Sequence, residues 1–164
     1  MSPRHEILFA IEDYLRERPD RWHVYVRSSK KADFIPRQWY ELLRDCLSPG
    51  GEVVETIIRF FFYCRNGRLR LYLELGPCGD RSLANRLLDR VLNDRDEFGF
   101  RGEAKRRPES WTRLFSTNVL AWPEDSPPDH MTIRGAIDSV LEKTESRLAE
   151  LPHALSPILH ERHS

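Results

Sequence analysis

The chain has 164 residues, 40% of them hydrophobic, and its 26 Lys and Arg balance its 26 Asp and Glu at a formal net charge of zero. This length suits one domain with a sizeable core, and the balanced charge excludes a whole-molecule field that would draw nucleic acid or an anionic membrane, so such binding would need a local patch. The three cysteines form no C-x-x-C pair and no apolar stretch is long enough to cross a bilayer, which argues against a disulfide framework, a zinc ribbon and a membrane partner and favours a cytoplasmic protein.

The first third of the chain alternates between helical and extended patterns. Apolar residues recur at helical spacing over residues 4–16 and predict a helix that a proline ends. Alternation over 22–27 predicts a strand, and 28–33 are polar and loop-like. Pro36 is expected to open a short helix that ends before the Pro-Gly-Gly at 49–51.

The clearest local pattern is a β-hairpin. Residues 57–64 are dense in Ile and Phe, Asn66-Gly67 is the preferred pair for a type I′ turn, and leucines alternate with other residues over 68–75. One face of the second strand must therefore be buried, while the other faces solvent or makes contacts. The residues on that other face are Arg68, Arg70, Tyr72 and Glu74.

The second half predicts two more helices and one or two strands. Asp80 can cap a leucine-striped helix, and Asp129 is expected to begin a last helix that Pro152 breaks. Residues 98–102 are predicted to form a short strand and 111–120 a longer one.

The order of these elements predicts an α+β fold. We expect a mostly antiparallel sheet of four to five strands around the central hairpin, with helices packed on one face. Residues 1–152 are expected to form a single domain, and residues 153–164 a flexible C-terminal tail.

A short motif suggests catalysis. Glu103-Ala104-Lys105 has the E-x-K spacing with which metal-dependent nucleases place a carboxylate on a divalent metal and a lysine near the attacked phosphate. The match is only three residues long, and the residues after it read as a loop. Glu103 and Lys105 are therefore catalytic candidates under a nuclease hypothesis alone, which would require Mg²⁺; otherwise no metal or cofactor is expected.

The most basic stretch of the chain surrounds a tryptophan and suggests a nucleic-acid patch. Phosphates pair with Arg and bases stack on Trp, whereas the alternative is a charged loop between strands with the tryptophan in the core. The residues of this patch are Arg101, Lys105, Arg106, Arg107, Trp111 and Arg113.

Three segments together carry a family resemblance: a leucine-rich strand ending in Gly-Pro, an arginine-bearing helix, and a Trp-centred strand before a final helix. In this sequence they are Leu71-Tyr72-Leu73-Glu74-Leu75-Gly76-Pro77, then Arg86-Leu87-Leu88, then Ser110-Trp111-Thr112-Arg113-Leu114-Phe115-Ser116. This succession, over roughly residues 57–151, resembles the C-terminal accessory region of bacterial proteins of the PD-(D/E)XK nuclease superfamily. The resemblance implies a bacterial or mobile-element setting and, because the catalytic core is lacking, binding more than catalysis. In element order alone the chain is also similar to small dimeric secretion chaperones.

Three functional hypotheses follow. The first is a non-enzymatic binding domain of bacterial or phage origin that recognises a protein partner through Arg68, Arg70, Tyr72 and Glu74, because interface centres mix Arg and Tyr in this way. Such a domain would suit a defence, toxin or mobile-element system, and a homodimer is compatible with it. The second is a small metal-dependent nuclease, and the third is a nucleic-acid binder without cleavage.

Overall fold

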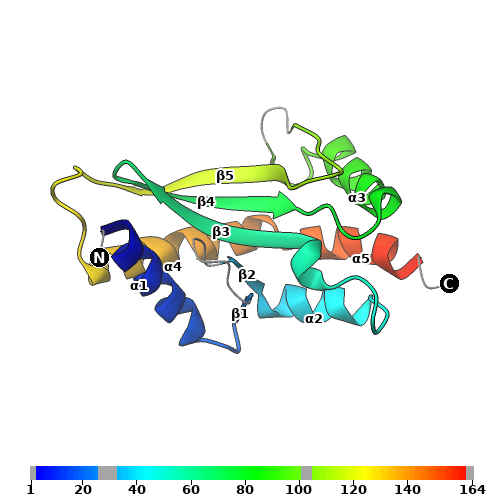
Figure 1. Ribbon diagram of the computed structural model, residues 1–164, viewed down its shortest axis with the longest axis horizontal. Helices are drawn as coiled ribbons and strands as arrows, with labels where there is room; N and C mark the ends of the chain where they lie inside the picture. The colour runs from blue at the N-terminus through cyan, green and yellow to red at the C-terminus, as the bar shows by residue number, and fades with distance from the viewer. Residues whose placement is uncertain (1–2, 26–32, 101–104, 162–164) are drawn as a thin grey trace.

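The computed structural model describes residues 3–25, 33–100 and 105–161 and has two layers, a sheet and a set of helices on one of its faces (Figure 1). The strands are β1 (Trp22–Val24), β2 (Asp33–Pro36), β3 (Ile58–Arg65), β4 (Arg68–Leu75) and β5 (Thr112–Ala121). The helices are α1 (Pro3–Arg16), α2 (Arg37–Asp45), the 3-10 turn η1 (Val54–Thr56), α3 (Arg81–Asn93), α4 (His130–Arg147) and α5 (Leu151–Glu161). The predicted α+β fold is confirmed.

The five strands form one sheet in the order β1-β2-β3-β4-β5, with every neighbouring pair antiparallel. Helices α1, α2, α4 and α5 lie on one side of this sheet, while α3 lies at its end beside α5 (Figure 1). Buried apolar side chains from every helix and strand join one hydrophobic cluster between the layers. Among the described residues, none of the helices combines the length and apolar character that crossing a membrane requires.

The β3–β4 hairpin forms as its sequence predicts. Asn66 and Gly67 have φ angles of 51° and 70°, the positive values that a type I′ turn needs. A Cβ at Gly67 would lie 2.4 Å from the carbonyl oxygen of Trp122, so glycine is required here for space as well as for conformation. The leucines of β4 are fully buried against the helices.

The strand β2 is absent from the sequence prediction. The polar pattern predicts a loop up to Asp33, yet β2 begins at that residue, and Phe34 and Ile35 are both fully buried. The last three of its four residues are all buried and show no alternation, so only the pairing with β1 and β3 identifies β2 as a strand. The predicted first strand is shorter than expected, because β1 ends at Val24; residues 26 and 27 lie outside the described residues.

The prediction of a strand over residues 98–102 is wrong for residues 98–100, which are the part that the structure describes. Residues 94–100 form successive turns, in which the backbone N–H groups of Glu97 and Gly99 donate to the carbonyl oxygens of Asp94 and Asp96. Phe98 is buried in the core, so its apolar side chain reflects packing rather than a strand. Residues 101 and 102 lie outside the described residues.

The predicted flexible tail is wrong over residues 153–161, which belong to α5. Leu151, Leu155 and Leu159 lie on one face of this helix and are buried. Pro152 falls in the first turn, where a helix does not use the N–H that proline lacks. Inside the helix, Pro157 leaves the His153 carbonyl without its usual donor, and the Ser156 hydroxyl lies 3.5 Å from that oxygen and donates to it.

We expect Leu155→Ala to lower the free energy of unfolding by about 2–5 kcal/mol, because it would open a cavity in the core. Urea unfolding of the purified chain measures this loss. The control is Met131→Ala, a side chain that is 84% exposed, which should change the value by less than about 0.5 kcal/mol. Equal effects of the two substitutions would show that α5 adds nothing to the core.

Candidate functional site on the outer face of the sheet

The two faces of the sheet differ in chemistry. Side chains on one face join the hydrophobic cluster beneath the helices, whereas the alternate side chains point to the opposite face, which we call the outer face. Apart from Arg4 of α1, which reaches Tyr63 at the hairpin-turn end, the described helices lie on the other side of the sheet or at its end (Figure 1). The residues of the outer face include Arg59, Phe61, Tyr63 and Arg65 from β3, Arg68, Arg70, Tyr72 and Glu74 from β4, Arg113, Ser116 and Asn118 from β5, and Trp111, which immediately precedes β5.

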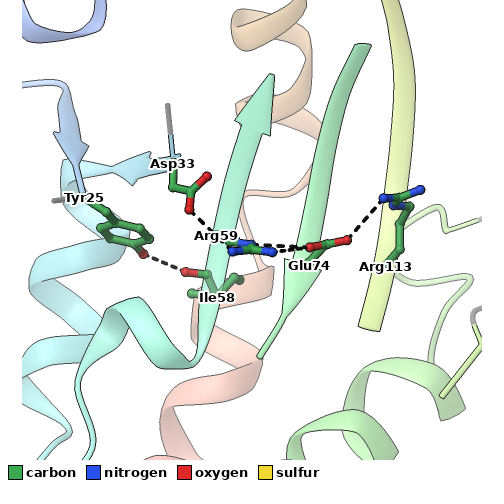
Figure 2. Close-up of polar contacts among 6 residues, drawn as sticks. All are labelled: Tyr25, Asp33, Ile58, Arg59, Glu74 and Arg113. Atoms are coloured by element: carbon green, nitrogen blue, oxygen red, sulfur yellow. Dashed lines mark hydrogen bonds and ion pairs between the residues drawn. The ribbon is translucent and has the colours of Figure 1, made fainter. Parts of the chain in front are cut away.

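Four charged side chains form a chain of ion pairs across the outer face, which we call the ion ladder (Figure 2). Arg59 lies between two carboxylates, with Nη2 2.9 Å from Oε1 of Glu74 and Nη1 3.4 Å from Oδ2 of Asp33. The other oxygen of Glu74, Oε2, is 3.4 Å from Nη2 of Arg113. The ladder therefore takes one residue from each of β2, β3, β4 and β5, and its charges sum to zero.

Aromatic rings hold both arginines of the ladder in place. The guanidinium carbon of Arg59 is 3.8 Å from the ring centroid of Trp111, and that of Arg113 is 3.9 Å from the centroid of Tyr72. These are cation–π distances. Gly76 makes the first contact feasible, because a Cβ at that position would lie 2.8 Å from the Trp111 ring.

Tyr25 fixes the β2 end of the ladder. Its backbone N–H donates to the carbonyl of Asp33 at 2.8 Å, and its hydroxyl donates to the carbonyl of Ile58 at 2.7 Å, next to Arg59 (Figure 2). Burial raises the pKa of this hydroxyl well above its usual value, so it remains a donor across the physiological range.

The centre of the ladder is only slightly accessible to water, whereas Arg113 at its end is half exposed. The side chain of Glu74 is 8% exposed and that of Arg59 is 17% exposed. Charges taken this far out of water are stable only when they are paired, so Glu74 and Arg59 depend on their neighbours. The centre of the outer face is therefore a rigid, electrically neutral unit.

The hairpin-turn end of the outer face has a different charge balance. No carboxylate of the described residues lies within 4.0 Å of Arg65, Arg68 or Arg70. The outer face is thus neutral at the ion ladder, where the charges are paired, and positively charged near the hairpin turn, where these arginines have no carboxylate partner among the described residues.

The structure places all four residues of the predicted protein-binding set on the outer face, with one correction. Arg68 is exposed as expected and Arg70 is partly buried, but Tyr72 is 7% and Glu74 6% exposed, so both of these are buried rather than facing solvent. The reason is that Arg113 covers the Tyr72 ring and two arginines enclose the Glu74 carboxylate.

The predicted basic patch is divided in the structure. Trp111 and Arg113 belong to the outer face, whereas Arg106 turns toward α3 and binds Oδ1 of Asp89 at 2.5 Å and Oδ1 of Asn85 at 2.6 Å. Lys105 and Arg107 are exposed in the loop before β5. The remaining member, Arg101, lies outside the described residues.

The nuclease hypothesis stays a prediction. Glu103 lies outside the described residues, and Lys105 is an exposed loop residue. Within the described ranges, no three His, Cys, Asp or Glu side chains gather as a metal site would require.

Sequence reasoning missed Arg59 and Asp33. A usable signal for Arg59 was present, because a two-residue turn at Asn66-Gly67 sets the register of the hairpin and places Arg59 directly opposite Glu74. Asp33 carried no comparable signal, since its strand is too short and too buried to show alternation.

A separate cleft of about 760 Å³ lies away from the outer face, between α2 and the junction of α4 with α5. Arg21, Trp39, Glu145 and His153 are among the residues that line it. Burial raises the pKa of Glu145, and the nearby Arg21, at 3.9 Å, only partly offsets this effect. The ionised carboxylate is thus less favourable here than in the unfolded chain.

No protein-family model matches the chain, and neither the curated proteins nor the solved structures searched give a match.

We expect Glu74→Gln to lower the free energy of unfolding by about 2 kcal/mol, because two guanidinium groups would lose the carboxylate between them. The loss should stay below the roughly 3–5 kcal/mol of a fully buried pair, since Arg113 is half exposed and Asp33 still faces Arg59. Urea unfolding provides the measurement, and Glu124→Gln, at an exposed position, is the matched control. A loss no larger than that of the control would contradict the structural role of the ladder.

We expect Glu145→Gln to stabilise the protein at neutral pH. A carboxyl group with a raised pKa in the folded state binds its proton more tightly there than in the unfolded chain, so stability falls as the pH rises from about 4.5 through the folded pKa and stays lower above it. The substitution removes this loss. Melting temperature as a function of pH tests it, with Glu142→Gln on the exposed side of α4 as control; an unchanged pH profile for Glu145→Gln would refute the assignment.

Proposed function

We propose that this chain is a non-enzymatic binding protein that recognises a protein partner through the outer face of its sheet. The observation that carries the proposal is the ion ladder, which holds Arg59, Arg113, Tyr72 and Trp111 in fixed positions on a face that none of the described helices covers. Arginine and large aromatic side chains are the types enriched at the centres of protein interfaces. Fixing them before binding reduces the entropy lost on association.

The same contacts favour a protein partner over a nucleic acid. Bases would stack on exposed aromatic rings, but guanidinium groups already lie over Trp111 and Tyr72. The ladder also contributes no net charge, and the chain as a whole has none. Phosphate attraction would therefore rest on the few unpaired arginines of the hairpin.

The proposed setting is a bacterial or phage defence, toxin or mobile-element system. It rests on the resemblance of residues 57–151 to accessory regions of PD-(D/E)XK nuclease proteins. In such a system the protein partner of this chain would supply the catalytic activity. A cytoplasmic location is part of the same proposal, since Cys46, Cys64 and Cys78 are all free thiols.

Affinity capture from the native host, followed by quantitative mass spectrometry, tests the proposal. We expect the wild-type chain to retain a stoichiometric protein partner, and we expect Tyr63→Ala and Ser116→Trp to lose it. Tyr63 and Ser116 lie on the outer face, Ser116 opposite Tyr72, and neither belongs to the ladder. Lys143→Ser, on the exposed side of α4, is the control and should retain the partner.

Two results would contradict this function. One is a partner that the outer-face variants retain as well as the wild type does. The other is Mg²⁺-dependent cleavage of DNA or RNA that Glu103→Ala abolishes, which would establish the nuclease alternative instead.

A further inference from the structure

Building on the proposed function, we propose that the hairpin-turn end of the outer face binds an acidic peptide segment of the partner and takes up its carboxylates on Arg70, Arg68 and Arg65. We call these three residues the hairpin arginines. They lie on one face of β3 and β4, where Arg65 pairs with Arg68 across the strands and Arg70 follows two residues later.

Arg70 is the centre of this site. Its cross-strand neighbours, Tyr63 on β3 and Asn118 on β5, are uncharged, and no carboxylate of the described residues lies within 4.0 Å of it. Its Nε is buried without a hydrogen-bond acceptor. A partly buried charge without a partner is costly, and a carboxylate that binds it offsets this cost.

The paired arginines of the same face show what Arg70 lacks. Arg59 and Arg113 share the carboxylate of Glu74, and each also lies within 4 Å of a ring centroid. Arg70 is 5.7 Å from the centroid of Tyr72 and has no acidic partner. An external carboxylate would therefore extend the ladder by one more pair, with the bidentate geometry that arginine offers.

The surroundings of the hairpin turn add to the positive charge. A notch of about 540 Å³ lies there between α1, the turn and the residues that follow β5. Arg4 and Arg65 line it, Arg4 standing 5.4 Å from the ring centroid of Tyr63, and Glu124 is the one acidic side chain among its lining residues. Two arginines and one glutamate thus line the notch, and Arg68 and Arg70 add two more positive charges on β4 nearby, which suits an acidic segment rather than a single ion.

Fluorescence anisotropy with a labelled peptide of alternating Asp and Gly tests this inference on the full chain. We expect saturable binding that weakens as salt is added, and no binding of the same peptide with Asn in place of Asp. Labelled oligothymidylate is the second probe. Tighter binding of the oligonucleotide than of the Asp peptide would overturn the inference in favour of nucleic acid.

Variants locate the binding. Arg70→Gln should weaken binding of the Asp peptide roughly tenfold, the effect of losing a charge-assisted pair. Arg70→Lys, which keeps the charge but not the bidentate geometry, should lie between Arg70→Gln and the wild type. The control Lys143→Gln should bind as the wild type does. If Arg70→Gln and Lys143→Gln bind alike, or if the Asp peptide does not bind, the inference is wrong.

The affinity-capture experiment separates this inference from the proposed function. Capture that is lost in Tyr63→Ala and Ser116→Trp but retained in Arg70→Gln would leave the outer face as the binding surface and remove the hairpin arginines from it. Loss of capture in all three variants, together with peptide binding, supports both. A partner retained by Tyr63→Ala and Ser116→Trp contradicts the proposed function itself.

Discussion

The carboxylate of Glu74 is the constraint on which the outer face depends. It accepts from Arg59 on one side and faces Arg113 on the other, so a single buried negative charge fixes two arginines from two different strands. Asp33 extends the same set of pairs to β2. These pairs therefore connect four neighbouring strands, β2 to β5, across the outer face.

This arrangement gives the sheet two unlike faces with different tasks. The leucine and phenylalanine face stabilises the fold by burial against the helices. The outer face instead holds charged and aromatic side chains at fixed positions. Its ion pairs contribute little net free energy to folding, because desolvation offsets much of their attraction. A surface of this kind contributes less to folding than an apolar one would.

The features that could be predicted from the sequence are those with local causes. The type I′ turn follows from Asn66-Gly67, and Asp80 and Asp129 accept from the backbone N–H groups of Leu83 and Thr132, as residues at the start of a helix do. The features that could not be predicted depend on tertiary contacts. β2 exists because β1 and β3 flank it, and α5 forms around two prolines because a leucine stripe is buried against the core.

The candidate site was predicted in part for the same reason. The alternation of residues in β4 identifies the side chains that point to the outer face. It predicts that they are exposed to solvent, because a pattern within one strand carries no information about the adjacent strands. Trp111 and Arg113 were assigned to a separate basic patch, since the β4–β5 pairing that brings Arg113 opposite Glu74 spans a connection of 36 residues, from residue 76 to residue 111. Only the folded sheet shows that the two sets are neighbours.

The position of Arg4 has a practical consequence for handling the protein. Helix α1 begins beside the hairpin turn, whereas α5 ends at the opposite end of the molecule (Figure 1). An affinity tag or fusion partner joined at the N-terminus would thus emerge next to Tyr63 and compete for the space around the cationic turn. Attachment through the C-terminus keeps that end clear, which makes it the suitable choice for immobilising the chain on a surface or linking it to a reporter.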